Sequence, residues 1–303
     1  MKFVSRYLCI VLCLSLGACE RASQHSSTLQ YSNRPAVPVA TIYRLAIPPL
    51  SSPHKLSEAY QPLVHYLNSH IDGVEIELES SRNFKIYEQK FRERKPELLL
   101  LNPWETLQAI KSGYHVIAMA GDAEDFKGIF IIRKDSAIKT PADLKGKTVS
   151  YPSQTALAAA IMTQYYLHTQ GINVNRDIHN IYVGAHESSI LNAYLGKAAA
   201  ASTWPPAWRL FQKDHPQEAS QLKVIWETPP LINNAVMVRD DVPAAISQQI
   251  AQALPRLGKT AEGKSILEGM ETARFHPASD RSYDRIRKYI ARFEREVRPV
   301  EHN

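Results

Sequence analysis

The stretch GIFIIRKDS at residues 128–136 decides the fold, because a pattern of strands and helices starts again there. Its apolar run after a glycine is typical of a short buried strand. Before it, residues 41–120 already alternate between short apolar runs and amphipathic segments, and after it the alternation continues to 234–238. Such alternation is typical of a mostly parallel sheet covered by helices. Its restart predicts two α/β units, the second inserted into the first.

The expected elements follow from the spacing of apolar residues. The segments 122–127 and 228–233 are expected to be two crossovers, so that 41–125 and 235–303 form one lobe and 126–234 the other. A cleft between two lobes is where small ligands usually bind. Thr140-Pro141-Ala142-Asp143 is expected to cap a helical turn, with proline at its first position. Strands are expected at 41–47, 74–78, 97–101, 115–120, 128–133, 147–151, 179–183, 198–202, 222–226 and 234–238, and helices at 54–68, 83–95, 104–112, 155–170, 187–195, 243–257, 260–270 and 279–297.

The first residues read as a leader for export. Lys2 and Arg6 precede an apolar segment at 7–16, which is too short to span a bilayer. The sequence LGAC at 16–19 resembles the lipobox of bacterial lipoproteins, which implies a signal peptide at 1–18 and a lipid on Cys19. The alternative is an ordinary cleaved signal peptide in which Cys19 has no special role. Residues 19–40 are polar and rich in Ser and Pro, and they read as a tether between a periplasmic membrane face and the folded body.

Composition argues against several classes of protein. Among the 303 residues are three cysteines, and Cys19 is the only one left once the leader is removed, which excludes an internal disulfide or a cysteine-based zinc site. The net charge of +6 is mild and favours anionic ligands or lipid head groups over nucleic acid. The eleven histidines are scattered, and no pair at metal-ligand spacing is repeated nearby. Gly146-Lys147-Thr148 looks like the end of a P-loop, but Pro141 stands where its first glycine belongs. We expect no catalytic residues, metal or cofactor.

Three polar residues precede the helix expected at 155–170. Ser153, Gln154 and Thr155 would place two hydroxyls and an amide beside the free N–H groups of its first turn. Those N–H groups and the helix dipole favour an anion. Ordinary N-capping is the alternative, because the same residue types cap helices everywhere.

Two further sets of polar residues follow expected strands, where ligands gather in open α/β sheets. His186 could donate to an oxyanion, and Glu187 could accept from a ligand amine. The alternative is that Glu187 only stabilises the first turn of its helix. Asn102 offers a donor and an acceptor to the cleft, and a capping role before the helix at 104 is the equal alternative.

Three residues at the lobe boundary complete the candidate ligand-binding set. Phe126 stands at the first crossover, and the adjacent Lys127 could pair with an anionic ligand. An exposed lysine without such a role is the commoner case. Trp204 follows the strand at 198–202 and could form a wall of the cleft, although core packing is the stronger expectation for a tryptophan.

The residues between 43 and 275 resemble the phosphate, phosphite and phosphonate substrate-binding proteins of ABC transporters, a branch of the type II periplasmic binding proteins. The segments that carry the resemblance are ELLLLNP at 97–103, GIFIIRKDS at 128–136, DLKGKTV at 143–149, HESS at 186–189 and VIWETPPL at 224–231. The chain differs from the family at two places. Its phosphonate binders usually have Ser-Thr-Ser-Gly where this chain has SQTA at 153–156, and often a tyrosine where it has Phe126.

The resemblance implies a type II periplasmic-binding-protein-like α/β fold, with two lobes, a central ligand cleft and two crossover strands. It further implies a monomeric protein that closes on a small anionic solute, such as a phosphonate or phosphate, while the lipid anchor rests on the lipobox at 16–19. The solute would then pass to an inner-membrane ABC permease. A ligand-sensing partner of a membrane receptor kinase is the alternative with the same fold, and an enzyme built on it is a third.

Overall fold

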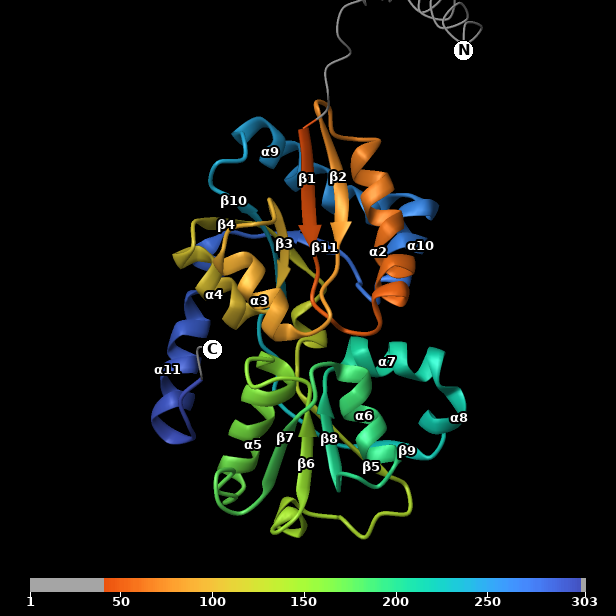
Figure 1. The fold of residues 1–303 in the computed structure, drawn as a ribbon, viewed down its shortest axis with the longest axis vertical. Coiled ribbons are helices and arrows are strands. Elements are labelled where there is room, and N and C mark those ends of the chain that lie inside the picture. Colours follow the sequence, from red (N-terminus) through yellow and green to blue (C-terminus); the bar gives the residue numbers. More distant parts are fainter. Residues whose placement is uncertain (1–40, 301–303) are drawn as a thin grey trace, which may run out of the picture. The chain divides into compact units, whose positions relative to one another are not determined.

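The computed structural model describes residues 41–300. Their fold is built on two β-sheets (Figure 1). Each sheet belongs to one lobe, with helices on its faces. In spatial order the first sheet consists of β11 (Phe275–Pro277), β4 (Tyr114–Ala120), β10 (Asn234–Arg239), β3 (Leu98–Leu101), β1 (Thr41–Ala46) and β2 (Val74–Glu79). The second consists of β7 (His179–Tyr182), β6 (Thr148–Tyr151), β8 (Ala200–Thr203), β5 (Ile129–Arg133) and β9 (Leu222–Glu227).

The chain passes between the sheets twice. It leaves the first sheet at the end of β4 and enters the second at β5, then returns between β9 and β10. The two crossing segments are bonded to each other, because Thr228 N donates to Gly128 O (2.9 Å) and Gly128 N donates to Thr228 Oγ1 (3.0 Å). The two α/β lobes and the two crossovers predicted from the restart at residue 128 are confirmed.

The prediction of mostly parallel sheets was wrong in part, because both sheets are mixed. Strand β1 is parallel to β2 and β3, and β6 is parallel to β7 and β8. However, β10 runs antiparallel to β3 and β4, and β5 runs antiparallel to β8 and β9. Strands β10 and β5 each follow a crossing directly. The chain enters each of these two strands from the other lobe. Both strands therefore run antiparallel to the neighbouring strands, which belong to strand–helix units within their own lobe.

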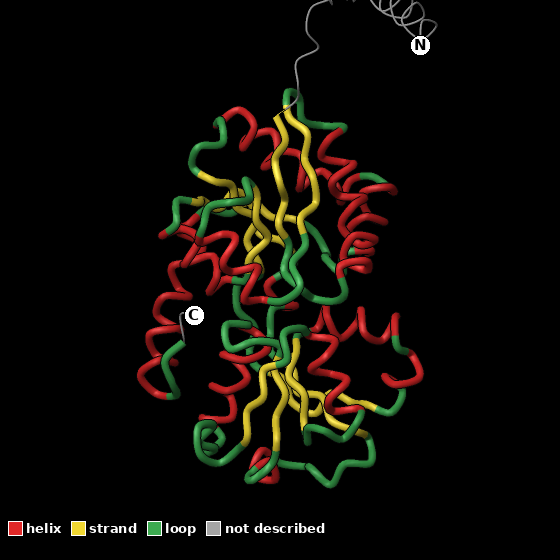
Figure 2. Tube along the Cα trace, viewed as in Figure 1, coloured by secondary structure: helices red, strands yellow, loops and turns green. Residues whose placement is uncertain are grey.

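Helices cover both faces of each sheet (Figure 2). The first lobe contains α2 (Pro53–Asn68), α3 (Phe84–Arg92), α4 (Pro103–Lys111), α9 (Ala244–Ala253), α10 (Ala261–Gly269) and α11 (Asp284–Glu296), with 3₁₀ turns η1 (Ala123–Asp125), η4 (Leu254–Lys259) and η5 (Asp280–Tyr283). The second contains η2 (Pro141–Leu144), η3 (Leu157–Met162), α5 (Thr163–Thr169), α6 (His186–Tyr194), α7 (Pro205–Asp214) and α8 (Pro216–Ala219). No helix among these is long and apolar enough to cross a bilayer.

The C-terminal helix behaves as its periodicity predicts, although it begins later than residue 279. Ile286, Ile290 and Phe293 are buried in the apolar cluster that lies under α3 and α4. Beyond the helix, Arg298 donates to the carbonyl of Gln154 in the second lobe (3.0 Å) and to Gln164 Oε1 (2.8 Å). The C-terminal segment therefore contacts both lobes.

Three elements were not expected from the sequence. Helix α7 begins with two prolines in its first turn. Proline lacks an N–H group, which is tolerated there because N–H groups of the first turn have no acceptor within the helix. In the sequence, however, two adjacent prolines indicate a loop. Helix α7 continues into α8. Strand β11 has only three residues and ends in a proline, so its strand character comes from pairing with the edge of β4.

The helix expected at 155–170 begins at Leu157, and its first part, η3, is a π-helix that continues into α5. The Thr163 hydroxyl donates to the carbonyls of Ala159 (2.9 Å) and Ala160 (3.1 Å) within it. The crossing chain passes against this segment at Gly128, where a Cβ would lie 2.3 Å from Ala158 O. Only glycine allows so close an approach, which fixes the start of the helix beside the crossing.

Candidate functional site

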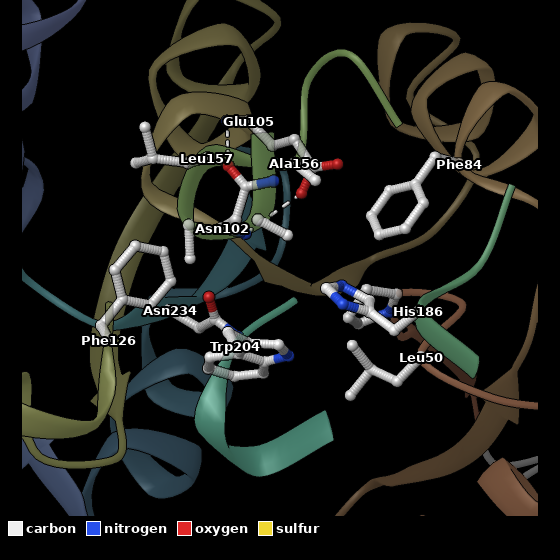
Figure 3. Close-up of a pocket in the computed structure, with 13 residues that line it drawn as sticks. Leu50, Phe84, Asn102, Glu105, Phe126, Ala156, Leu157, His186, Trp204 and Asn234 are labelled. Carbon is white, nitrogen blue, oxygen red and sulfur yellow. Dashed lines mark hydrogen bonds between the residues drawn. The ribbon is translucent and has the colours of Figure 1, made fainter. Parts of the chain in front are cut away.

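Side chains from both lobes line a pocket with an empty volume of about 340 Å³ (Figure 3). Among the described residues, its lining includes no lysine or arginine. The first lobe contributes Pro48, Leu50, Phe84, Asn102, Glu105 and Asn234, the first crossing Phe126, and the second lobe Ala156, Leu157, Ala158, Ala159, His186 and Trp204.

The start of η3 forms one wall of the pocket. The first backbone bonds of this helical segment join Ala160 N (2.7 Å) and Ile161 N (3.3 Å) to Ala156 O. The N–H groups of residues 156–159 therefore precede the first helical donor, as at any helix start, and these residues line the pocket. A helical segment running from Leu157 to Thr169 also directs the positive end of its dipole there.

The three polar residues expected as the anion seat lie just before this wall. The Thr155 hydroxyl is buried and donates to Glu88 of α3, Ser153 Oγ lies 2.8 Å from Thr155 Oγ1, and Thr155 N donates to Ser153 Oγ (3.1 Å). The carbonyl of Gln154 accepts from Arg298. Gln154 and Thr155 therefore join the lobes next to the pocket, and Ser153 supports Thr155. None of the three is among the lining residues.

Asn102 caps a helix, which is one of the two roles that the sequence left open, and it also lines the pocket. Its Oδ1 caps α4 by accepting from Trp104 N (2.9 Å) and Glu105 N (3.1 Å). Its Nδ2 donates to Thr155 O (3.4 Å), which joins the two lobes, and the side chain lines the pocket. The two capping bonds orient the side-chain amide of Asn102, so that its Nδ2 donor faces the second lobe.

Glu105 is a pocket residue that the sequence reasoning missed. Its Oε2 accepts from Asn102 N (3.1 Å), which completes a capping box, and its side chain has no solvent exposure. Burial, followed by the negative charge of Glu88, raises the pKa of Glu105 well above its usual range. Burial therefore favours the protonated, uncharged form of this carboxyl. The capping-box spacing directly after a buried strand was the signal that could have found it.

His186 is buried at the start of α6, and its ring lines the pocket. Its Nδ1 lies 2.8 Å from Thr203 Oγ1, which fixes the orientation of the ring. Burial lowers the pKa of His186 to about 3, so the imidazole is uncharged at neutral pH. His186 can offer a hydrogen bond to a ligand but no positive charge.

Three polar atoms of the pocket have no hydrogen-bond partner within residues 41–300: Glu105 Oε1, Trp204 Nε1 and Asn234 Oδ1. Each belongs to a side chain that is at least nine-tenths buried. Phe126 packs edge-on against Trp204, with ring centroids 5.8 Å apart. Buried polar groups without partners are rare because they cost free energy. Their convergence on one pocket (Figure 3) indicates a polar ligand.

Two residues expected at the site are engaged elsewhere. Lys127 forms an ion pair with Glu227 at the end of β9, and it is not a lining residue. Glu187 accepts from His215 (2.8 Å) and lies 3.9 Å from the Lys55 ammonium. Glu187 is likewise absent from the lining, although its neighbour His186 is part of it. Cys19, with the leader and tether, lies outside the described residues. Within those residues, no group of three side chains could hold a metal ion.

Comparison with known proteins gives a consistent result. A family model described as "ABC transporter, phosphonate, periplasmic substrate-binding protein" matches residues 45–283. A probable ABC transporter phosphite-binding protein of Prochlorococcus marinus is 22% identical over 184 residues, 56% of this chain and 62% of that protein. The phosphonates-binding periplasmic protein of Escherichia coli is 22% identical over 165 residues, 53% of this chain and 49% of that protein. The chain thus matches about half to three fifths of the length of these curated relatives.

Two solved structures share the fold. A binding protein of a phosphonate ABC transporter from Pseudomonas aeruginosa superposes with a TM-score of 0.78 at 17% identity, covering 85% of this chain and 88% of that one. PhnD1 of Prochlorococcus marinus, solved with methylphosphonate, gives a TM-score of 0.75 at 19% identity, covering 84% and 99%.

Proposed function

Because the chain belongs to the family of phosphonate-type periplasmic substrate-binding proteins of ABC transporters, we propose that it captures a small phosphonate-like oxyanion and delivers it to an inner-membrane ABC permease. The proposed ligand site is the pocket between the lobes. The observation that carries the proposal is the convergence of three unpartnered polar atoms on that pocket, beside the N–H groups of a helix start.

The donors that line the pocket and the contacts between the lobes have separate roles in this proposal. The N–H groups of residues 156–159 and the Trp204 indole donate to the oxyanion, and His186 donates from the opposite side. Neutral donors bind an anion through charge-assisted hydrogen bonds without a fixed counter-charge, so the ligand stays exchangeable. Asn102 and Thr155 join the lobes beside the ligand, and binding proceeds by hinge closure. The steps involve no covalent chemistry and no cofactor.

Titration of the protein with methylphosphonate, phosphite, phosphate and methanesulfonate tests the proposal. A ligand at about 100 times its Kd adds roughly 2.7 kcal/mol to the free energy of unfolding, which a thermal-shift assay detects. Trp204→Phe should weaken binding of the best ligand about 10- to 100-fold, because a hydrogen bond to a charged group is lost. Trp208→Phe is the matched control, since Trp208 is a buried tryptophan outside the pocket. Equal affinities of the two variants would place the ligand elsewhere.

The proposed location is the periplasmic face of a bacterial membrane, with a monomer anchored through a lipid on Cys19. The small residues before Cys19 support it. Cys19→Ala should move the protein from the membrane fraction to the soluble fraction. Transport is tested by deleting the gene and growing the bacterium on the bound phosphonate as its only phosphorus source. Binding without a growth defect would favour the ligand-sensing role over transport.

A further inference from the structure

The pocket presents a carboxyl group to a ligand that is proposed to be an anion. Glu105 has no solvent exposure, its Oε2 accepts from Asn102 N (3.1 Å), and its Oε1 has no partner within residues 41–300. In Figure 3 the carboxyl lies beside Asn102 and shares the pocket with the His186 and Trp204 rings. Since Oε2 already accepts, a proton on Oε1 would make the free oxygen a donor.

The charged and titratable groups around Glu105 favour that proton. Helix α3 contributes Glu88, whose negative charge opposes ionisation of Glu105, and Arg92, whose positive charge partly offsets it. Arg92 is bound to Glu88 at 2.7 Å. Tyr87 of the same helix is buried and uncharged, and across the pocket His186 is uncharged as well. An ionised Glu105 would therefore leave an anion in a lining without cations, which is costly inside a protein.

We propose that Glu105 contacts the bound ligand as a protonated carboxyl that donates to the oxyanion, and that the site takes a singly charged oxyanion with a small uncharged substituent. This inference rests on the proposed function of the pocket. A protonated acid can donate to an anion, whereas a carboxylate would repel it. The affinity of the pocket for the ligand then depends on pH, because it depends on the proton on Glu105.

The remaining lining supports the uncharged substituent. Phe84, Phe126 and Leu50 supply apolar surface around the polar atoms. Glu187, the carboxylate that could have received a ligand amine, is paired with His215 outside the pocket. An ammonium group on the ligand would thus be buried without a counter-charge, which binding sites avoid. A methyl group or a hydrogen has no charge and avoids that cost.

Two variants of Glu105 separate these roles. Glu105→Gln keeps an acceptor for Asn102 N and an N–H donor toward the ligand, so it should bind methylphosphonate within about threefold of the wild type at pH 6. Glu105→Ala loses the donor, and its affinity should fall at least tenfold. Asp143→Ala is the matched control, because Asp143 occupies the same capping-box position in the exposed turn η2. Denaturant unfolding establishes that each variant is folded at the temperature of the titration.

The pH dependence distinguishes a proton donor from a merely structural side chain. As the pH rises above the ordinary glutamate value of 4.5 and through the raised pKa of Glu105, the affinity of the wild type should fall relative to that of Glu105→Gln, since only the wild type loses a proton from this position. The titration of methylphosphonate itself affects both proteins equally and cancels in the ratio. 2-Aminoethylphosphonate should bind at least tenfold more weakly than methylphosphonate to the wild type.

The outcomes separate this inference from the proposed function. If no oxyanion of the panel binds the wild type, the proposed function fails. If methylphosphonate binds, the inference is overturned by unchanged affinity of a folded Glu105→Ala, by a pH-independent ratio of wild type to Glu105→Gln, or by equal or tighter binding of 2-aminoethylphosphonate. A tenfold loss in Glu105→Ala, together with a ratio that depends on pH and the expected ligand order, supports it.

Discussion

Two of the capping boxes in residues 41–300 contain an acid, one in each lobe, and they show how one local motif acquires two chemistries. Asn102-Pro103-Trp104-Glu105 begins α4, and Thr140-Pro141-Ala142-Asp143 begins η2. In both, a proline occupies the first helical position and an acid three residues after the cap accepts from the backbone N–H of the cap. The distances are 3.1 Å for Asn102 N to Glu105 and 2.8 Å for Thr140 N to Asp143.

Burial separates the two acids. Asp143 is exposed and accepts from Thr140 N, Lys139 N and the Thr140 hydroxyl, and these bonds lower its pKa. Glu105 is fully buried, and desolvation raises its pKa well above the usual range. The motif therefore determines the start of a helix, and the surroundings determine whether its acid is stabilised in the charged or in the uncharged form. Only the buried box contributes to a pocket.

The largest expected difference between the boxes is in ligand binding. Asn102→Asp keeps an acceptor for the first turn of α4 but replaces the Nδ2 donor with a negative charge at the pocket. Like charges brought together at a binding site cost several kcal/mol, so the affinity for methylphosphonate should fall at least about 100-fold. Thr140→Asp makes the same kind of change in the exposed box, and calorimetry should find its affinity unchanged. Similar losses in both variants would mean that the box beside the pocket has no special position.

The free energy of unfolding should differ less between variants at these two positions than the ligand affinity does. Asn102→Ala leaves the N–H groups of Trp104 and Glu105 without their acceptor and removes the bond to Thr155. Loss of a cap costs about 0.5–2 kcal/mol, and burial places Asn102 near the upper limit. Thr140→Ala in the exposed turn should cost about 0.5 kcal/mol. Urea unfolding at neutral pH measures both, and an equal cost would show that burial does not strengthen the cap.

The sequence predicts the architecture well because the architecture depends on local periodicity. The restart at Gly128 and the two crossings follow from apolar runs within a few residues of each other. Strand direction was predicted less well, since β5 and β10 owe theirs to the route of the chain between lobes and not to their own residues. The π-helical start at Leu157 depends on contact with Gly128, about thirty residues earlier, and no local pattern encodes it.

The residues of the candidate site could also be predicted only in part. Asn102 and His186 were predicted from their positions after strands, and both line the pocket. Asn234 was missed because it reaches the pocket from the return crossing, far along the chain from the other lining residues. Lys127 and Glu187 have the right residue types, but they are paired with Glu227 and His215 in the folded protein. Partners that are distant in sequence decide whether a charged side chain is available to a ligand.

A third comparison concerns the pH dependence of stability, where the two acids should act with opposite sign. The folded state raises the pKa of Glu105 above its ordinary value of 4.5. Above that pH the unfolded chain releases the proton first, so the free energy of unfolding falls as the pH rises toward the folded-state pKa. The slope cannot exceed about 1.4 kcal/mol for each pH unit. Glu105→Gln should remove this decline in a series of urea midpoints above pH 4.5. An unchanged slope would show that Glu105 is ionised in the folded protein.

The smallest effect is expected for Asp143. Its pKa lies below the ordinary value of 3.8 because the backbone N–H groups of Thr140 and Lys139 stabilise the charged form. The resulting stabilisation is complete above that value and is lost as the pH falls through the folded-state pKa, which is the opposite sign to that of Glu105. Asp143→Asn should therefore lower the urea midpoint slightly at neutral pH and leave it unchanged at the most acidic pH at which the protein is folded. Exposure and salt screening keep this difference small. If Asp143→Asn and Glu105→Gln changed the pH profile in the same direction, burial would not be what divides the two capping boxes.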